Sequence, residues 1–181
     1  MQIRETSIAG LVEIFPRVFE DERGMFFESF NVELFKSLGL PTNFVQDNQS
    51  FSKKGVVRGL HFQNAPFAQG KLVRVISGSV LDVAVDIRPE SPTFGKHEIF
   101  ILRSDTNNMA YIPEGFAHGF AALEDSIFTY KCTNLYSKVS ESGILWSDPD
   151  LGIDWGVENP IVSEKDLILP TLRALFEKQN L

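Results

Sequence analysis

The stretch that decides the fold is Val80-Leu81-Asp82-Val83-Ala84-Val85-Asp86-Ile87-Arg88. Its odd positions are leucine, valine, valine and isoleucine, whereas its even positions include Asp82, Asp86 and Arg88. Apolar residues at every second position predict a β-strand with one apolar and one polar face. By this pattern alone, the two aspartates could lie on the solvent face of an edge strand.

The segments on either side of this stretch also have strand character. Residues 72–76 precede it, and Ser77-Gly78-Ser79 between the two has the backbone freedom of a tight turn, which predicts an antiparallel hairpin of 72–76 with 80–88. β-Rich runs follow at 99–102, 109–112 and 126–130, separated by turn residues such as those at 91–95. Short strands at this spacing predict an all-β sandwich or barrel.

Helical patterns are confined to the flanks of the chain. Asn31 is a suitable N-cap for a segment that places Leu34, Phe35 and Leu38 on one face, and Gly39 is suited to end it. Residues 172–178 form a second short candidate. Neither segment is long enough to organise the fold, so the core is expected to be β.

Length and charge narrow the class of protein. A chain of 181 residues with 43% hydrophobic and 23% charged residues is expected to form one globular domain, 1–181. The 17 basic and 24 acidic residues give a net charge of -7, which disfavours nucleic acid or an anionic membrane as a partner. Any phosphate must therefore be bound by local cations.

Cysteine content and the N-terminus indicate a cytoplasmic location. Cys132 is the only cysteine, which excludes a disulfide or a thiolate metal cluster within the chain and suits a reducing compartment. The first residues lack a basic segment followed by an apolar one, and charges or turn residues interrupt every apolar run. We expect neither export nor membrane insertion.

Three histidines are the first candidates for chemistry. His61 and His118 lie among glycines and aromatics in sequences typical of strand edges, and His97 lies in an expected turn. No His-x-His pair is present, so a metal-free use is favoured over a two-histidine site completed by distant carboxylates. From spacing alone, a partly buried ring with satisfied hydrogen bonds is the favoured interpretation of each.

Other candidate residues also have ordinary structural explanations. Lys71 could be a solvated charge at a strand end, Tyr130 could be core packing, and Asp166 could complete a capping box that begins at Ser163. Strict alternation would place Arg58 and His61 on opposite faces of one strand. If both serve one site, a bulge at Gly59 is required between them.

Several blocks together resemble the dTDP-4-dehydrorhamnose 3,5-epimerase family. They lie in the family's order over almost the whole chain. The blocks are Asp21-Glu22-Arg23-Gly24-Met25-Phe26-Phe27-Glu28, Gly55-Val56-Val57-Arg58-Gly59-Leu60-His61-Phe62-Gln63, Gln69-Gly70-Lys71-Leu72-Val73-Arg74-Val75, Asp82-Val83-Ala84-Val85-Asp86-Ile87-Arg88, Ser91-Pro92-Thr93-Phe94-Gly95, Pro113-Glu114-Gly115-Phe116-Ala117-His118-Gly119-Phe120 and Ser163-Glu164-Lys165-Asp166.

The resemblance implies an all-β, cupin-like jelly-roll barrel with a few short flanking helices, a homodimer, and no metal or organic cofactor. It implies inversion of C3 and C5 of dTDP-4-dehydro-6-deoxy-D-glucose to give dTDP-4-dehydro-L-rhamnose, a step of rhamnose supply for surface polysaccharide.

The resemblance also implies roles for individual residues. His61 would be the general base oriented by Asp166, Tyr130 the proton donor on the opposite face of the sugar, and Lys71 the residue that holds the C4 oxygen. Tyr136 is a second tyrosine to be distinguished from Tyr130. The implied substrate-binding residues are Arg23, Glu28, Gln46, Asp47, Asn48, Arg58, His118, Glu141 and Lys165.

These residue types suit the reaction. Removing a proton from a carbon beside a ketone gives an enolate, which a neutral imidazole can generate near pH 7 when a carboxylate fixes its tautomer. An ammonium at the C4 oxygen strengthens its interaction as negative charge develops. Arg23 and Arg58 would pair with the diphosphate, and Phe19 and Phe26 could supply an aromatic face for thymine.

Three alternatives stay open. The same base and cation would serve an epimerase that acts only at C3, or one that uses another nucleotide-linked 4-keto sugar. A metal-dependent cupin oxygenase or isomerase is a different class, suggested by the β-fold with His61 and His118. A non-catalytic module that binds nucleotide sugars is the third.

Overall fold

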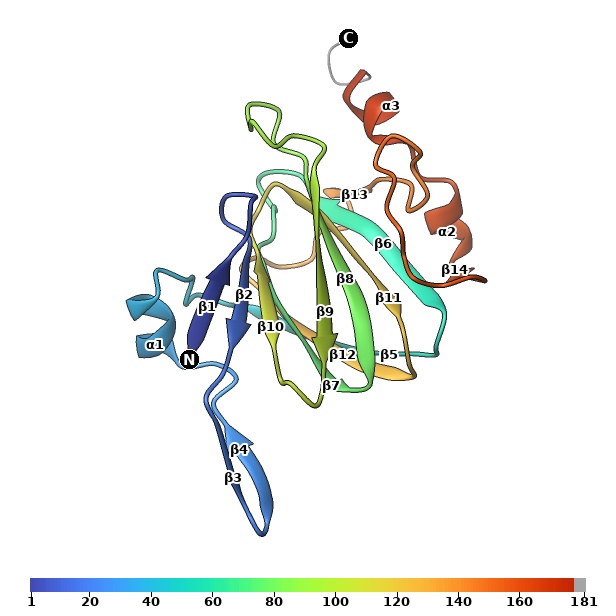
Figure 1. Ribbon diagram of the computed structural model, residues 1–181. Helices are drawn as coiled ribbons and strands as arrows, with labels where there is room; N and C mark the ends of the chain where they lie inside the picture. Colours follow the sequence, from blue (N-terminus) through green and yellow to red (C-terminus); the bar gives the residue numbers. More distant parts are fainter. Residues whose placement is uncertain (178–181) are drawn as a thin grey trace.

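In the computed structural model, which describes residues 1–177, two six-stranded sheets form the body of the molecule (Figure 1). The first sheet has the order β1 (Gln2–Glu5), β2 (Val12–Phe15), β10 (Met109–Ile112), β7 (Lys71–Ser77), β12 (Ser126–Cys132), β5 (Gln46–Ser52). The second has the order β13 (Glu141–Gly143), β6 (Val56–Gln63), β11 (Phe116–Ala122), β8 (Ser79–Asp86), β9 (His97–Arg103), with β14 (Ile161–Val162) parallel to β6.

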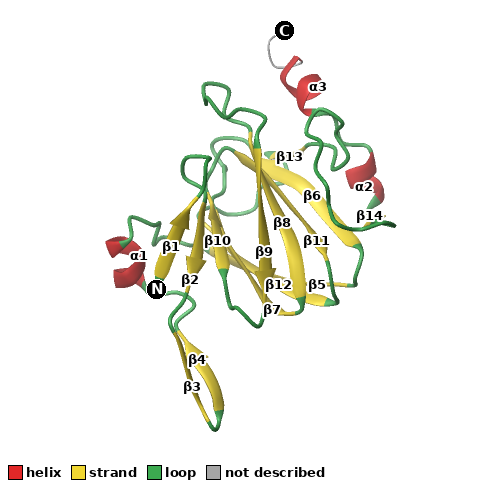
Figure 2. Ribbon diagram, viewed as in Figure 1, coloured by secondary structure: helices red, strands yellow, loops and turns green. Residues whose placement is uncertain are grey.

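The remaining elements lie at the periphery (Figure 2). A hairpin of β3 (Val18–Asp21) and β4 (Gly24–Phe27) projects from the body, and the helices are α1 (Val32–Ser37), α2 (Glu164–Leu167) and α3 (Leu172–Glu177). The predicted all-β jelly roll with short flanking helices is confirmed, as two opposed sheets without a closed barrel. No helix within residues 1–177 has the length and apolar character needed to cross a membrane.

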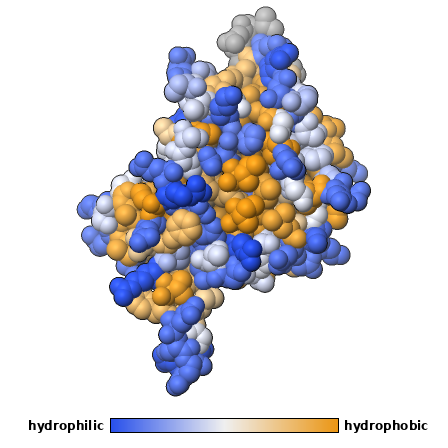
Figure 3. Space-filling view, viewed as in Figure 1, coloured by the Kyte–Doolittle hydropathy of each residue, from blue (hydrophilic) through white to orange (hydrophobic). Residues whose placement is uncertain are grey.

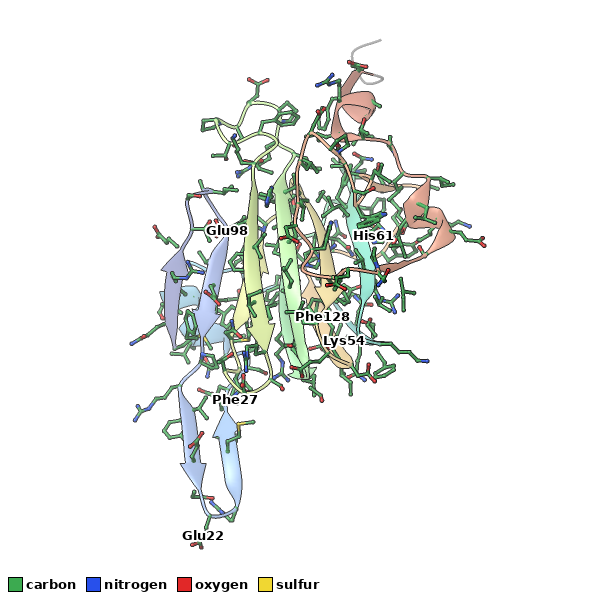
Figure 4. The ribbon with its side chains drawn as sticks, turned by 45° about the vertical axis from the view of Figure 1, so that its right-hand side comes forward. Glu22, Phe27, Lys54, His61, Glu98 and Phe128 are labelled. Carbon is green, nitrogen blue, oxygen red and sulfur yellow. The ribbon has the colours of Figure 1, made fainter. Side chains whose placement is uncertain are left out.

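The main core lies between the two sheets. Val73 and Phe128 of the first sheet pack with Val80, Phe100 and Phe120 of the second, and all are at least 95% buried. Phe128 lies inside the body between the strands in Figure 4. Because both sheets contribute to this core, their inner faces are held together by removal of apolar surface from water.

A second core covers the outer face of the second sheet. Val83 and Val85 of β8 pack there against Ile144, Trp155 and Leu172 of the C-terminal segment. This cover accounts for the apolar positions of the period-two pattern in β8. The alternate positions of the strand consequently point inward, between the sheets.

The predicted hairpin of residues 72–76 with 80–88 is wrong. β7 pairs with β10 and β12 in the first sheet, whereas β8 pairs with β11 and β9 in the second. Gly78, at φ +85°, lies where the chain passes from one sheet to the other. A glycine turn permits either connection, and the decisive factor is that both strands bury apolar side chains in the same inner core.

The solvent-face interpretation of Asp82 and Asp86 is also wrong. Both are completely buried, because β8 is a central strand and its polar face lies between the sheets. Asp86 accepts hydrogen bonds from Arg88, Ser91 and Thr93, which fix the turn after the strand. His97, expected in a turn, is instead the first residue of β9.

The local predictions at both flanks are confirmed. The Asn31 side chain accepts hydrogen bonds from the backbone N–H groups of Glu33 and Leu34, and Gly39 follows the helix at φ +71°. Leu172–Glu177 is helical as expected, whereas Lys178, the last residue of that candidate, lies outside the described residues.

The predicted bulge at Gly59 is confirmed as well. His61 lies opposite His118, but Arg58 lies opposite Phe120, so three steps along β6 match two steps along β11. The extra residue returns Arg58 and His61 to the same face of the sheet. Gly59 has φ +121°, and a Cβ placed on it would lie 2.5 Å from the Gly119 Cα and 2.8 Å from the His118 carbonyl oxygen.

We therefore predict that Gly59→Ala costs about 2–4 kcal/mol of unfolding free energy, since the methyl group would force two backbones apart. Gly152→Ala is the matched control, because Gly152 also has a positive φ (57°) but nothing lies within 4 Å of the position that a Cβ on it would occupy. It should cost only about 1–2 kcal/mol, the strain of left-handed backbone. Urea denaturation measures both, and equal losses would contradict the close-approach argument.

Candidate active site

A cavity of about 650 Å³ opens between the sheets beside α2. This volume lies within the range of about 300–1,000 Å³ usual for small-molecule sites. The strands β5, β6, β7, β11, β12, β13 and β14 contribute to its walls together with α2. The predicted residues that line it are Asn48, Arg58, His61, Lys71, His118, Tyr130, Glu141, Lys165 and Asp166.

The cavity forms where the inner faces change from apolar to polar. On β11, Phe116 and Phe120 belong to the inner core, and His118 lies on the same face between them. On β12, Tyr130 follows Phe128 on the inner face. Alternation along each strand thus aims polar side chains into the sandwich, with aromatic rings beneath them.

His61 and Asp166 form a tight pair across 105 positions of sequence. The Nε2 atom of His61 is 2.7 Å from Oδ1 of Asp166, and the other carboxylate oxygen accepts from the backbone N–H of Gly59 at 3.4 Å. Asp166 is held by the one-turn helix α2, whose N-cap Ser163 accepts from the Asp166 backbone N–H. The predicted cap is thus present, but the Asp166 carboxylate is directed at His61.

A second histidine and carboxylate pair lies deeper. The Nε2 atom of His118 is 2.8 Å from Oδ2 of Asp82, and both residues are buried. Burial, together with the nearby Lys71 and His61, lowers the pKa of His118 more than the charge and hydrogen bond of Asp82 raise it, so the ring is neutral near pH 7. The aspartate that the strand pattern left at the surface is therefore buried behind His118, which lines the cavity.

Lys71 and Tyr130 lie on neighbouring strands of the opposite sheet. The Lys71 ammonium is 5.9 Å from the centre of the Tyr130 ring and donates a long hydrogen bond, 3.5 Å, to the backbone carbonyl of His61. Burial lowers the pKa of Lys71, and it raises the pKa of Tyr130 despite the opposing charge of Arg58. Tyr130 is thus a protonated phenol at neutral pH.

Arg58 and the rim supply further polar groups. Arg58 donates to Ser52 Oγ at 3.0 Å and to the carbonyl of Phe51 at 3.2 Å, which fixes its guanidinium beside the cavity. At the mouth, Glu141 accepts from Lys165 at 3.2 Å and from the Tyr136 hydroxyl at 3.0 Å.

The two tyrosines are now distinguishable by position. Tyr130 lines the cavity next to Lys71, whereas Tyr136 is 54% exposed and lies at the rim. Desolvation raises the pKa of the Glu141 carboxyl, but the hydrogen bonds from Lys165 and Tyr136 lower it by more. The net result is a pKa below the usual value. Glu141 therefore ties Tyr136 to Lys165 as a carboxylate.

Four predicted substrate-binding residues do not line this cavity. Asp47 faces the other side of β5 and forms an ion pair with Lys131 at 2.7 Å. Gln46 donates to Asn48 and accepts from the backbone of Tyr136, just behind the rim. Their roles in binding stay predictions.

Arg23 and Glu28 lie still farther away. Arg23 is paired with Asp21 on the projecting hairpin, whose tip residue Glu22 is at the far end of the molecule from His61 in Figure 4. Glu28 accepts from Asn31 at the base of α1. Figure 3 shows a polar hairpin tip and apolar surface nearer its base. Within one chain, the structure does not bring these two residues to the cavity.

The sequence interpretation missed one polar residue next to this site, Asp82. The Asp82 carboxylate is hydrogen-bonded to His118, whereas the Ser163 cap of the helix that carries Asp166 follows the predicted capping box. The sequence marks Asp82 as a polar residue in an otherwise apolar strand. Whether its side chain points inward depends on which face of the sheet the C-terminal segment covers. Among the described residues, no group of three or more histidine, cysteine, aspartate or glutamate side chains is arranged to hold a metal ion.

Comparison with known proteins agrees with this geometry. The family model for dTDP-4-dehydrorhamnose 3,5-epimerase matches residues 5–174. A dTDP-4-dehydrorhamnose 3,5-epimerase of Shigella flexneri is 53% identical over 169 residues, which are 92% of this chain and 93% of that protein.

Solved structures give the same result. The dTDP-6-deoxy-D-glucose-3,5-epimerase of Legionella pneumophila, in complex with dTDP-4-keto-L-rhamnose, has a TM-score of 0.93 and 46% identity, covering 98% of this chain and 95% of that one. A 3'-monoepimerase of Streptomyces bikiniensis, in complex with dTDP-quinovose, has a TM-score of 0.90 and 33% identity, covering 97% and 90%. The chain therefore belongs to the dTDP-4-dehydrorhamnose 3,5-epimerase family of isomerases.

Proposed function

We propose that this protein inverts C3 and C5 of dTDP-4-dehydro-6-deoxy-D-glucose to give dTDP-4-dehydro-L-rhamnose, with His61 as the base and Tyr130 as the proton donor. The observation that carries the proposal is the convergence of the His61 and Asp166 pair, Lys71 and Tyr130 on one cavity. The relatives that act on dTDP-linked 4-keto sugars support the substrate class. A cytoplasmic location, suggested by the single cysteine, belongs to the same proposal.

The base can be assigned to one nitrogen. Because Nε2 of His61 contacts Asp166, the carboxylate holds the proton there and leaves the Nδ1 lone pair free. Nδ1 removes the proton from the carbon beside the ketone, and the electron pair moves onto the C4 oxygen. Asp166 stabilises the imidazolium that forms.

Lys71 and Tyr130 complete the step. The ammonium of Lys71 stabilises the enolate oxygen more strongly than the ketone oxygen, which lowers the barrier. The Tyr130 phenol, kept protonated by burial, gives its proton to the carbon from the opposite face. Both C3 and C5 flank the carbonyl, so the same groups serve both centres, and proton exchange with water resets His61 and Tyr130.

Exchange of hydrogen with solvent tests the proposal. In deuterated water, incubation with dTDP-4-keto-6-deoxyglucose should place deuterium at both C3 and C5, because the returned proton comes from a phenol that exchanges with solvent. NMR of the product measures each position. Binding without exchange at either carbon would refute the proposal and favour a binding module.

A C3-only epimerase is the second candidate, since a 3'-monoepimerase is among the similar structures. Deuterium at C3 alone would favour it. The higher identity to proteins named 3,5-epimerase, 53% against 33%, supports the double inversion.

Removing the base should abolish most turnover. We expect His61→Ala to lower kcat by about 10²–10⁴-fold, the usual contribution of a general base. His97→Ala is the matched control, because His97 lies on β9 and does not line the cavity. Steady-state kinetics of both variants decides, and near-normal turnover by His61→Ala would contradict the assignment.

The distant position of Arg23 points to a second copy of the chain. The hairpin of β3 and β4 pairs only within itself among the described residues, and Phe19 and Phe26 on it are at least half exposed. An isolated hairpin is marginally stable in water, so it is expected to pack against another surface. We propose a homodimer in which the partner's hairpin brings Arg23 and Phe26 to the cavity.

Subunit mixing tests this arrangement. If each cavity combines His61 of one chain with Arg23 of the other, a mixed dimer of His61→Ala and Arg23→Ala chains contains one intact cavity. Measured as kcat/KM at substrate concentrations far below KM, random mixing should then restore about a quarter of the wild-type value, since half of the dimers are mixed and one of their two sites is complete. No recovery would show that each site is built within one chain.

The control for Arg23 is Arg103. Both arginines are exposed and pair with an aspartate two positions away, Arg23 with Asp21 and Arg103 with Asp105. Arg103→Ala should leave KM unchanged, whereas Arg23→Ala should raise it roughly tenfold or more through loss of a charged hydrogen bond to the diphosphate.

A further inference from the structure

Asp82 has an incomplete set of hydrogen bonds in a fully buried position. Its Oδ2 atom is paired with His118 at 2.8 Å, but its Oδ1 atom is buried and has no hydrogen-bond partner among residues 1–177. Asp86, four residues along the same strand, is equally buried yet is bonded by three side chains. A buried polar atom without a partner costs about 1–3 kcal/mol, and more when it is charged.

Within the described part of the chain, Lys71 is a buried cation that lacks an ion-pair partner, just as Asp82 is a buried anion that lacks a hydrogen bond at one oxygen. It is buried, and none of the described carboxylates lies within 4 Å of its ammonium. Removal from water lowers the pKa of a lysine, and nearby negative charge opposes this effect. Two groups oppose the effect of burial on the pKa of Lys71, first the Cys132 thiol and then the Asp82 carboxylate, whose partner His118 lines the same cavity as Lys71.

The other groups around Lys71 supply no such charge. They come from β12, β6 and β11, and they are Cys132, Tyr130, His61, Arg58 and His118. Burial raises the pKa values of Cys132 and Tyr130, so both are neutral at pH 7. Burial lowers the pKa of His118, which leaves the charge of its partner Asp82 unneutralised. Asp166 is committed to His61.

We propose that Asp82 is a positioning residue of this site, the buried counter-charge that keeps Lys71 an ammonium while it holds His118 in one orientation. Asp82 acts through these two side chains. This inference rests on the proposed function, because the charge of Lys71 matters for a reaction in which an oxyanion develops at C4. Its consequence is that Asp82 sets the upper pH limit of the enzyme.

The negative charge of Asp82 determines the direction in which its removal shifts the pH profile. Removing the Asp82 carboxylate destabilises the ammonium, so Lys71 loses its proton at a lower pH. Activity that needs the ammonium then falls at a lower pH as well. The alkaline limb of the kcat/KM profile should therefore move toward acid, by about one pH unit or more.

The test is Asp82→Asn, an amide of the same shape that can still bond His118. Its kcat/KM profile for deuterium exchange should have an alkaline limb at least about one unit lower than wild type, with a fall in rate of about fivefold or more at the wild-type alkaline midpoint. Asp86→Asn is the matched control: it removes a buried carboxylate from the same strand and should lower Tm without moving the limb. Cys132→Ser should also leave the limb in place.

The outcomes separate the two proposals. If wild type shows no exchange, the proposed function fails. If wild type exchanges and folded Asp82→Asn has a superimposable pH profile, the role of Asp82 is overturned while the function stands. If Asp82→Asn does not fold, NMR titration of ¹³C-lysine-labelled wild type, assigned with Lys71→Arg, still decides: a neutral Lys71 at pH 7 overturns the inference, and an ammonium supports it.

Discussion

The site depends on how the outer face of the second sheet is covered. Residues from Ile144 to Leu172 pack on the apolar side of β8 and β11, so that side of the sheet needs no further partner. The inner side is then free to carry polar residues where the two sheets separate, and apolar ones where they meet. Had the apolar positions of β8 faced inward, Asp82 would lie under the C-terminal segment and could not pair with His118. The polar cavity is thus a consequence of a cover made by a distant segment of the chain.

The close approach of β6 and β11 is the second constraint. Glycines at 59 and 119 let the two backbones pass where any side chain would collide, and the extra residue in β6 brings Arg58 and His61 onto one face. The carbonyl of Arg58 lies only 2.6 Å from the position that a Cβ on Gly119 would occupy. A guanidinium and an imidazole three positions apart can share a cavity on a strand only because of this irregularity. The backbone N–H of Gly59 also donates to Asp166, which in turn contacts His61, so the bulge supports the proposed base.

Local signals predicted the elements, and long-range packing decided their arrangement. Period-two alternation gives the strand at β8, and a capping asparagine gives α1, because both depend on neighbours in sequence. The pairing of β7 could not be inferred from Gly78, since a turn suits a hairpin and a change of sheet equally. His61 and Asp166 lie 105 positions apart, and no local pattern joins them; only the family resemblance did. Arg23 could be recognised by the same route, but its distance from the cavity in one chain is a structural finding.

The short helix α2 contributes one side chain to the rim of the cavity and another to its interior. Lys165 and Asp166 are consecutive, yet one side chain reaches Glu141 at the mouth and the other reaches His61 in the cavity. A helix of one turn is not stable alone, so its geometry depends on the Ser163 cap and on the parallel pairing of β14 with β6 just before it. Since the protein carries a net charge of -7, the few cations near the cavity must attract the diphosphate locally. Because Lys165 and Asp166 are adjacent, the position of one cation at the rim and the position of the carboxylate that holds His61 depend on the same turn of helix.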